Sequence, residues 1–138
     1  MKRLLTLILV CNTTYSFSQE LDSFKKISEE LKNGKSIRLV INFDNCLPHA
    51  PISDLVAYTE AKAVMIQSDH LQFANSHLTT NNPLFPTVLE NVTYSISEDN
   101  KVKLATKVIA LPDYNVIESR VTECKLDKNS VRVYAKDK

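Results

Sequence analysis

The order of apolar and polar residues predicts one amphipathic helix near the start of the chain. Apolar side chains recur every three or four residues, with charged residues between them, at Leu21, Phe24, Ile27 and Leu31. This spacing is typical of a helix with a single apolar face. Gly34, the only glycine in the chain, follows the run and predicts the left-handed residue that commonly ends a helix.

Beyond Gly34 the pattern changes to the two-residue alternation of β-strands. Six or seven strands joined by short links are predicted, over residues 37–43, 64–67, 70–75, 88–97, 102–110, 115–126 and 131–134. The turn Glu98-Asp99-Asn100 joins two of them into a long hairpin. Proline-containing loops are predicted over residues 47–51 and 76–86.

These short links indicate how the strands are arranged. Neighbouring parallel strands need a crossover of about a dozen residues, so short links favour antiparallel pairing. The alternation implies that each strand has one buried face and one face in water. We therefore expect an α+β fold, in which the N-terminal helix packs on a curved, mainly antiparallel sheet of six or seven strands, or on a small open barrel.

The first eighteen residues have the pattern of a secretory signal peptide. A positively charged start precedes an apolar run from Leu4 to Val10, and small residues occupy positions 16 and 18. We predict cleavage between Ser18 and Gln19, a single domain over residues 19–138, and a periplasmic or secreted location. The apolar run is shorter than the roughly 20 residues of a membrane span, so we expect no stable span after cleavage.

Two alternatives for this segment stay open. The apolar run can remain attached as an uncleaved anchor, although it is short for that purpose. Cys11 follows the run as in a lipoprotein signal, but Val10 is larger than the small residue that such a signal places before its cysteine.

Removal of the signal peptide changes both the charge and the cysteine count. The 17 basic residues fall to 15 against 16 acidic residues, which gives a formal charge of −1. Nucleic-acid-binding proteins have a strong basic excess instead, so we expect no nucleic-acid partner. Cys46 and Cys124 remain in a compartment where thiols are oxidised, and we predict a disulfide between them; two separate buried thiols are the alternative.

The motifs of many enzyme classes are missing from the sequence. A chain with one glycine has no glycine-rich phosphate loop, no dinucleotide-binding fingerprint and no G-x-S-x-G nucleophile elbow. It also has no H-E-x-x-H, C-x-x-C or calcium-loop motif. We therefore expect no cofactor and assign no catalytic, cofactor-binding or metal-binding residue.

The three histidines all fall between positions 49 and 77, which suggests a metal or acid–base site. On one strand, however, His70 and His77 would lie about 23 Å apart on opposite faces. A hydrogen-bonded structural role for His77 near a strand end is the simpler interpretation. Four tyrosines are likewise expected to pack in the core or at its rim rather than to line a ligand cavity: Tyr58, Tyr94, Tyr114 and Tyr134.

Three segments together resemble the VirK family of small exported bacterial proteins associated with virulence loci. They are Asn42-Phe43-Asp44-Asn45-Cys46, the run from Leu71 to Thr79, and Pro112-Asp113-Tyr114 with Cys124. The resemblance implies a bacterial origin, export and association with a host, and it implies no assigned activity. The positions that match the family are Cys46, Phe73, His77, Thr79 and Cys124. Of these, Phe73, His77 and Thr79 form a candidate functional or structural motif.

We favour a non-enzymatic, virulence-associated binding protein, stabilised by a disulfide, that recognises a protein or small ligand in the envelope or outside the cell. One alternative is a small hydrolase-type enzyme that uses His77 with Asp69 or Ser76. Another is a small β-barrel that carries a ligand in an apolar cavity. The position of His77 separates these functions, because an enzyme needs it beside another titratable group.

Overall fold

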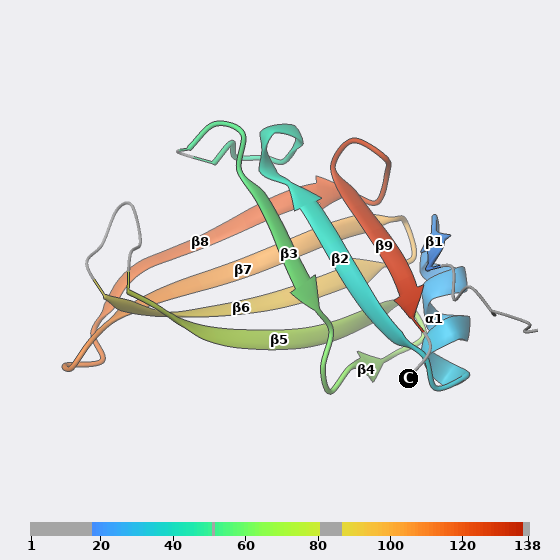
Figure 1. Cartoon of the computed structure of the whole chain (residues 1–138), viewed down its shortest axis with the longest axis horizontal. Coiled ribbons are helices and arrows are strands. Elements are labelled where there is room, and N and C mark those ends of the chain that lie inside the picture. Colours follow the sequence, from blue (N-terminus) through green and yellow to red (C-terminus); the bar gives the residue numbers. More distant parts are fainter. Residues whose placement is uncertain (1–17, 51, 81–86, 137–138) are drawn as a thin grey trace, which may run out of the picture.

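Two antiparallel sheets form the two layers of the protein (Figure 1). The computed structural model describes residues 18–50, 52–80 and 87–136. Its elements in chain order are β1 (Gln19–Leu21), α1 (Phe24–Lys32), β2 (Ser36–Asn42), the 3-10 helix η1 (Phe43–Asn45), β3 (Val56–Glu60), β4 (Met65–Ile66), β5 (His70–Thr79), β6 (Val88–Ser97), β7 (Lys101–Ala110), β8 (Val116–Lys125) and β9 (Val131–Lys136). Within this part of the chain, no helix is long and apolar enough to cross a membrane.

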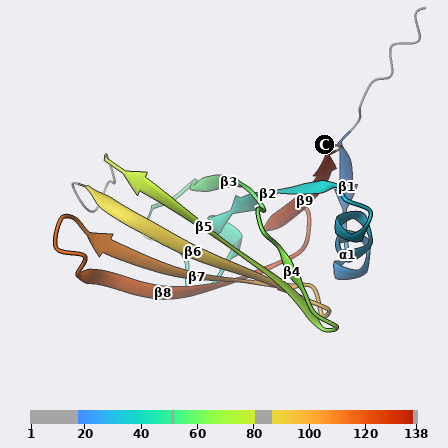
Figure 2. The ribbon, with the colours of Figure 1, turned by 90° about the horizontal axis from the view of Figure 1, so that it is seen from below.

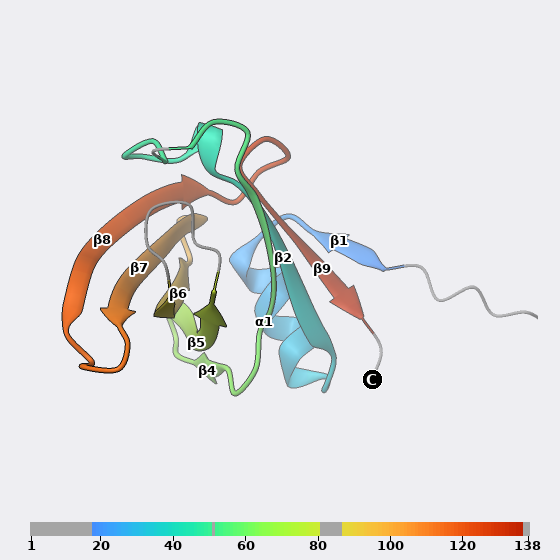
Figure 3. The ribbon, with the colours of Figure 1, turned by 60° about the vertical axis from the view of Figure 1, so that its left-hand side comes forward.

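The strands divide between the sheets by long-range pairing. One sheet has four strands in the order β1-β9-β2-β3, and the other has five in the order β4-β5-β6-β7-β8. β9 pairs antiparallel with both β1 and β2, so Val133 lies between Leu21 and Leu39. The C-terminal strand thus joins the N-terminal part of the chain, while the meander from β4 to β8 forms a second, curved layer (Figure 3).

The core lies between the two sheets and consists of the alternate strand residues that face inward. Its largest buried side chains include Ile37, Leu39, Ile41, Leu71, Ile96, Val102, Leu104, Val131 and Val133. Full burial of one such side chain stabilises the fold by about 1.5–3 kcal/mol. The rings of Phe73 and Tyr94 stack with their centroids 4.7 Å apart. Apolar burial from both layers therefore holds the sheets face to face.

The two sheets are also joined at one corner. A disulfide links Cys46, which follows η1, to Cys124 in β8. The adjacent residues pair through their backbones: the Leu47 N–H donates to the Glu123 carbonyl (2.8 Å), and the Glu123 N–H donates to the Leu47 carbonyl (2.6 Å). A crosslink across a sequence separation of 78 residues removes about 4.5 kcal/mol of unfolded-state freedom in the chain-entropy model.

The predicted α+β class, with an N-terminal helix packed on one sheet of six or seven strands or on a small open barrel, is wrong. The described residues are mostly β structure, in separate sheets of four and five strands that do not close into a barrel. α1 has nine residues and lies at one end of the two layers (Figure 2). The alternation pattern is local, so it does not reveal that β9 pairs with β1 and β2. The spacing of three to four residues also placed Leu21 in the predicted helix, whereas this residue belongs to β1.

Several local predictions agree with the structure. Gly34 has the predicted left-handed conformation, with φ of +84°, and β6 and β7 form the predicted hairpin. The loop before β6 begins later than predicted, because β5 continues to Thr79. Most of the predicted signal peptide, residues 1–17 with Cys11, lies outside the described residues.

The turn between β6 and β7 contacts the start of α1. The Asn100 Oδ1 accepts a hydrogen bond from the Phe24 N–H (3.1 Å). In the same turn, Asp99 accepts a hydrogen bond from the Ser97 hydroxyl (2.5 Å) and lies 2.6 Å from the Lys101 Nζ. The hydrogen bond from Lys101, followed by that from Ser97, lowers the pKa of Asp99 to about 2.

We predict that Asp99 titrates with a pKa of about 2 in the folded protein and that Lys101→Met raises this pKa. The folded-state pKa is below the unfolded value of about 3.9. The stabilisation from this carboxylate is therefore complete above the unfolded pKa and is lost as the pH falls through the folded pKa. Carboxyl NMR titration measures the pKa, with Lys103→Met as the control on the same strand. An unshifted Asp99 in the unmodified protein contradicts the prediction.

Candidate functional site

The inner face of the five-stranded sheet extends beyond the smaller sheet, and there it becomes polar. Figure 2 shows β5 to β8 projecting past β3. Because side chains alternate along a strand, His77 on β5 shares the face of the buried Phe73. Arg120 on β8 likewise shares the face of the buried Thr122. The same sheet face thus continues from the core to residues that stay buried on β6 and β7, such as Val92 and Val108, and become accessible at His77 on β5 and at Arg120 on β8.

Strand register aligns this surface in two rows. In the order β5, β6, β7, β8, the rows are Asn75, Val92, Thr106 and Arg120, followed by His77, Glu90, Val108 and Glu118. We call these eight residues the polar inner face. Its ionisable side chains are His77, Glu90, Glu118 and Arg120. In the second row, the apolar side chain of Val108 lies between Glu90 and Glu118.

A histidine–carboxylate pair occupies one side of the polar inner face. The His77 Nε2 lies 3.3 Å from the Glu90 Oε2. The His77 side chain is 55% exposed, whereas that of Glu90 is 17% exposed. The carboxylate is therefore largely covered, and the imidazole, whose Nε2 faces Glu90, has its Nδ1 left for a further hydrogen bond. His77 thus lies beside a titratable group, as the enzyme alternative requires, but at an exposed position and outside four cavities lined by described residues near α1, β1 and β2.

A second charged pair lies on the other side. The Arg120 Nη1 is 3.5 Å from the Glu118 Oε1, and both side chains are about one-third exposed. Glu118 is two strands away from Glu90 in the same row, which corresponds to about 10 Å between their Cα atoms. The two pairs thus present donors and acceptors on both sides of the apolar side chain of Val108.

Hydrogen bonds from Asn75 to β3 mark the boundary between the polar inner face and the core. The Asn75 Nδ2 donates to the Thr59 Oγ1 and to the Glu60 carbonyl (3.1 Å), which connects the two sheets. Burial raises the pKa of Tyr94; a hydrogen bond with Thr59 lowers it, and the Glu90 carboxylate raises it. Because the net shift is upward, the Tyr94 hydroxyl is protonated at neutral pH.

The structure brings the candidate motif together but separates the predicted hydrolase residues. Phe73, His77 and Thr79 share one face of β5, with Asn75 between the first two, which lie about 13 Å apart along the strand. Asp69 contacts His70 instead, at the opposite end of β5 from His77, with 2.8 Å between the Asp69 Oδ1 and the His70 Nδ1. Ser76 precedes His77 on the strand and so points to the opposite face. The side chains of Asp69 and Ser76 therefore do not lie beside the His77 imidazole.

Three members of the polar inner face could not be recognised from the sequence. Glu90, Glu118 and Arg120 have the spacing of ordinary polar positions on half-buried strands, and only the register of β5 to β8 places them near His77. Among the residues that the structure describes, no group of three or more His, Cys, Asp or Glu side chains is placed to hold a metal ion.

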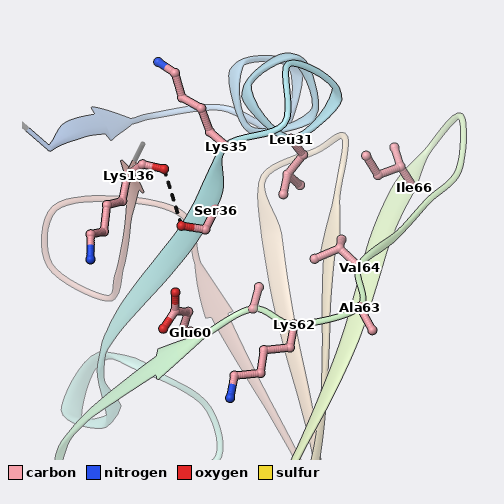
Figure 4. Close-up of a pocket in the computed structure, with 10 residues that line it drawn as sticks. Leu31, Lys35, Ser36, Glu60, Lys62, Ala63, Val64, Ile66 and Lys136 are labelled. Carbon is pink, nitrogen blue, oxygen red and sulfur yellow. Dashed lines mark hydrogen bonds between the residues drawn. The ribbon is translucent and has the colours of Figure 1, made fainter. Parts of the chain in front are cut away.

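A separate cavity of about 590 Å³ lies near the end of α1, the start of β2 and the link from β3 to β4 (Figure 4). Its larger apolar side chains are Leu31, Val64 and Ile66. Figure 4 shows the ammonium groups of Lys62 and Lys136 directed away from these apolar side chains. Because its charged groups do not converge, we place the candidate site on the polar inner face instead.

Comparison with known proteins gives one family and one structural neighbour. The VirK family, described as VirK protein, matches residues 20–114. A VirK family protein from Legionella pneumophila, lpg1832, has a similar crystal structure, with a TM-score of 0.75 and 23% sequence identity over 83% of this chain and 97% of that chain. At this identity the similarity shows a shared fold. No curated protein matches the sequence.

We predict that Asn75→Ala lowers the free energy of unfolding by about 1–3 kcal/mol, because it removes the hydrogen bonds that connect β5 to β3. Urea denaturation measures the change. Asn91→Ala is the matched control, since Asn91 lies on the opposite face of the same sheet, and we expect a change of less than about 0.5 kcal/mol. Equal losses in the two variants would contradict the assigned role of Asn75.

Proposed function

Because the chain belongs to the VirK family, we propose that it is an exported, virulence-associated binding protein that recognises a polar ligand on the polar inner face. The observation that carries this proposal is the contact between the exposed His77 imidazole and the largely covered Glu90 carboxylate. The two residues are register partners on β5 and β6, strands that project past β3 in Figure 2.

Two features support export to the periplasm or the cell exterior. The bond between Cys46 and Cys124 is of a kind that forms and persists in oxidising compartments. β1 begins at Gln19 and pairs with β9. A chain cleaved after Ser18 would therefore keep every described strand.

The geometry favours binding over hydrolysis. His77 has a carboxylate neighbour, but neither Asp69 nor Ser76 is placed to complete the predicted hydrolase site, so that alternative gains no support. The two open sheets likewise give no support to a ligand-carrying barrel. Charged pairs on both sides of the polar inner face suit a ligand that both donates and accepts hydrogen bonds, such as a sugar or a peptide segment.

Expression of the full-length chain in a bacterium tests the proposed location. We expect the periplasmic protein to have the mass of residues 19–138 less two hydrogen atoms, because cleavage follows Ser18 and both remaining cysteines are oxidised. Intact-mass spectrometry without reducing agent checks this. Retention of the first eighteen residues, or free thiols at both Cys46 and Cys124, would contradict the proposal.

A screen with sugars, amino acids and dipeptides, monitored by amide NMR shifts, tests the binding role. We expect at least one compound to shift the amides of His77, Glu90 and Arg120, and we expect His77→Ala and Glu90→Gln to weaken its binding about tenfold or more. His70→Ala is the matched control, since His70 also contacts a carboxylate, that of Asp69, at the far end of the same strand. The proposal fails if no compound binds this face, or if His77→Ala and His70→Ala have equal effects.

A further inference from the structure

The outer face of the four-stranded sheet carries arginine and tyrosine side chains next to one another. Register places Arg38 between Glu60 and Tyr134, and Val40 between Arg132 and Tyr58. The Arg38 guanidinium lies over the Tyr58 ring, 5.7 Å from its centroid, and the Arg132 guanidinium lies over the Tyr134 ring at 6.0 Å. These cation–π contacts hold two planar cations against neighbouring aromatic rings.

This face lies on the opposite side of the sheet from the core. Arg38 and Val40 alternate along β2 with the fully buried Ile37 and Leu39. We expected the tyrosines to pack in the core or at its rim. Tyr94 is buried, whereas Tyr58 is 61% exposed, so packing between the sheets does not account for its position.

A cavity of about 450 Å³ opens on this outer face. Its lining consists of Ser18, Arg38, Val40, Tyr58, Tyr134, Ala135 and Lys136, and cleavage after Ser18 would leave all of these except Ser18. Both charged residues in the lining are cations. Three other cavities lined by described residues each include at least one carboxylate side chain. Its charge therefore favours an anionic occupant.

Arg38 has hydrogen-bonding capacity that the described residues leave unused. Its Nε atom is buried and has no hydrogen-bond partner within the described part of the chain. Neither Arg38 nor Lys136 belongs to an ion pair between described residues. A buried donor without an acceptor is unfavourable. Because the Arg38 side chain also lines the cavity, an oxyanion there would lie beside its guanidinium group.

We propose that this cavity binds a small organic oxyanion, a carboxylate or phosphate group carried on a flat apolar body. The oxyanion accepts hydrogen bonds from Arg38 and pairs with Lys136, because a guanidinium presents planar donors that match both groups. The apolar body packs against Val40 and the rings of Tyr58 and Tyr134. The cavity volume is within the range of about 300–1,000 Å³ that small-molecule sites occupy. The site is separate from the polar inner face and does not depend on its function.

NMR titration of the purified protein tests the ligand class. The probes are 1-naphthoate and 1-naphthyl phosphate, with 1-naphthalenemethanol as the uncharged control and acetate as the oxyanion without a flat body. We expect one or both anionic naphthyl probes to shift the amides of Arg38, Tyr58 and Lys136, and both controls to bind about tenfold more weakly or worse. Equal binding of 1-naphthalenemethanol, or shifts confined to other surfaces, would overturn the proposal.

A matched pair of variants tests the role of the cation. Arg38→Gln is expected to weaken binding of the better probe about tenfold or more, because it removes the charge. Arg132→Gln is the control, since Arg132 also lies over a tyrosine on this sheet but does not line the cavity. Lys136→Gln is a second variant that leaves the contact between Arg38 and Tyr58 intact, and it is expected to weaken binding severalfold. Unchanged binding in Lys136→Gln and equal binding in the two arginine variants would contradict the site.

Discussion

The junction between Cys46-Leu47 and β8 is the constraint on which the arrangement of the two layers depends. The disulfide and the paired backbone hydrogen bonds fix the end of β2 to the edge of the larger sheet. β3 pairs with β2, so its position above the larger sheet follows from this junction. The hydrogen bonds from Asn75 to β3 then fix where the covered core ends. Beyond these hydrogen bonds, the larger sheet continues as the polar inner face.

The two candidate surfaces lie on different sheets and differ in chemistry. The polar inner face of the five-stranded sheet has paired charges of both signs, His77 with Glu90 and Glu118 with Arg120. On the outer face of the four-stranded sheet, Arg38 and Lys136 line a cavity together with the rings of Tyr58 and Tyr134. Balanced pairs suit a polar ligand with donors and acceptors, whereas cations that form no ion pair within the described part of the chain, beside aromatic rings, suit an oxyanion. Because the two surfaces lie on different sheets, a substitution on one surface can be tested without altering the other.

The local pattern predicted the helix, its glycine cap and the hairpin of β6 and β7, because each is formed by residues near one another in the sequence. It failed on the division into two sheets, since β9 pairs with strands about 100 residues earlier and alternation contains no information on such partners. The same limit applies to the site. His77 was found from its residue type and the family resemblance, whereas Glu90, Glu118 and Arg120 depended on a register that periodicity does not specify.

Amide hydrogen exchange tests most directly whether the Cys46–Cys124 junction holds the layers together. In the oxidised protein, the Leu47 and Glu123 amides should be protected because each donates across the junction. In a Cys46→Ala, Cys124→Ala variant, we expect protection of these two amides to be lost, together with about 2–5 kcal/mol of global stability, while the amides that join β6 to β7 remain the best protected. Unchanged protection at Leu47 and Glu123 in the variant would contradict this account.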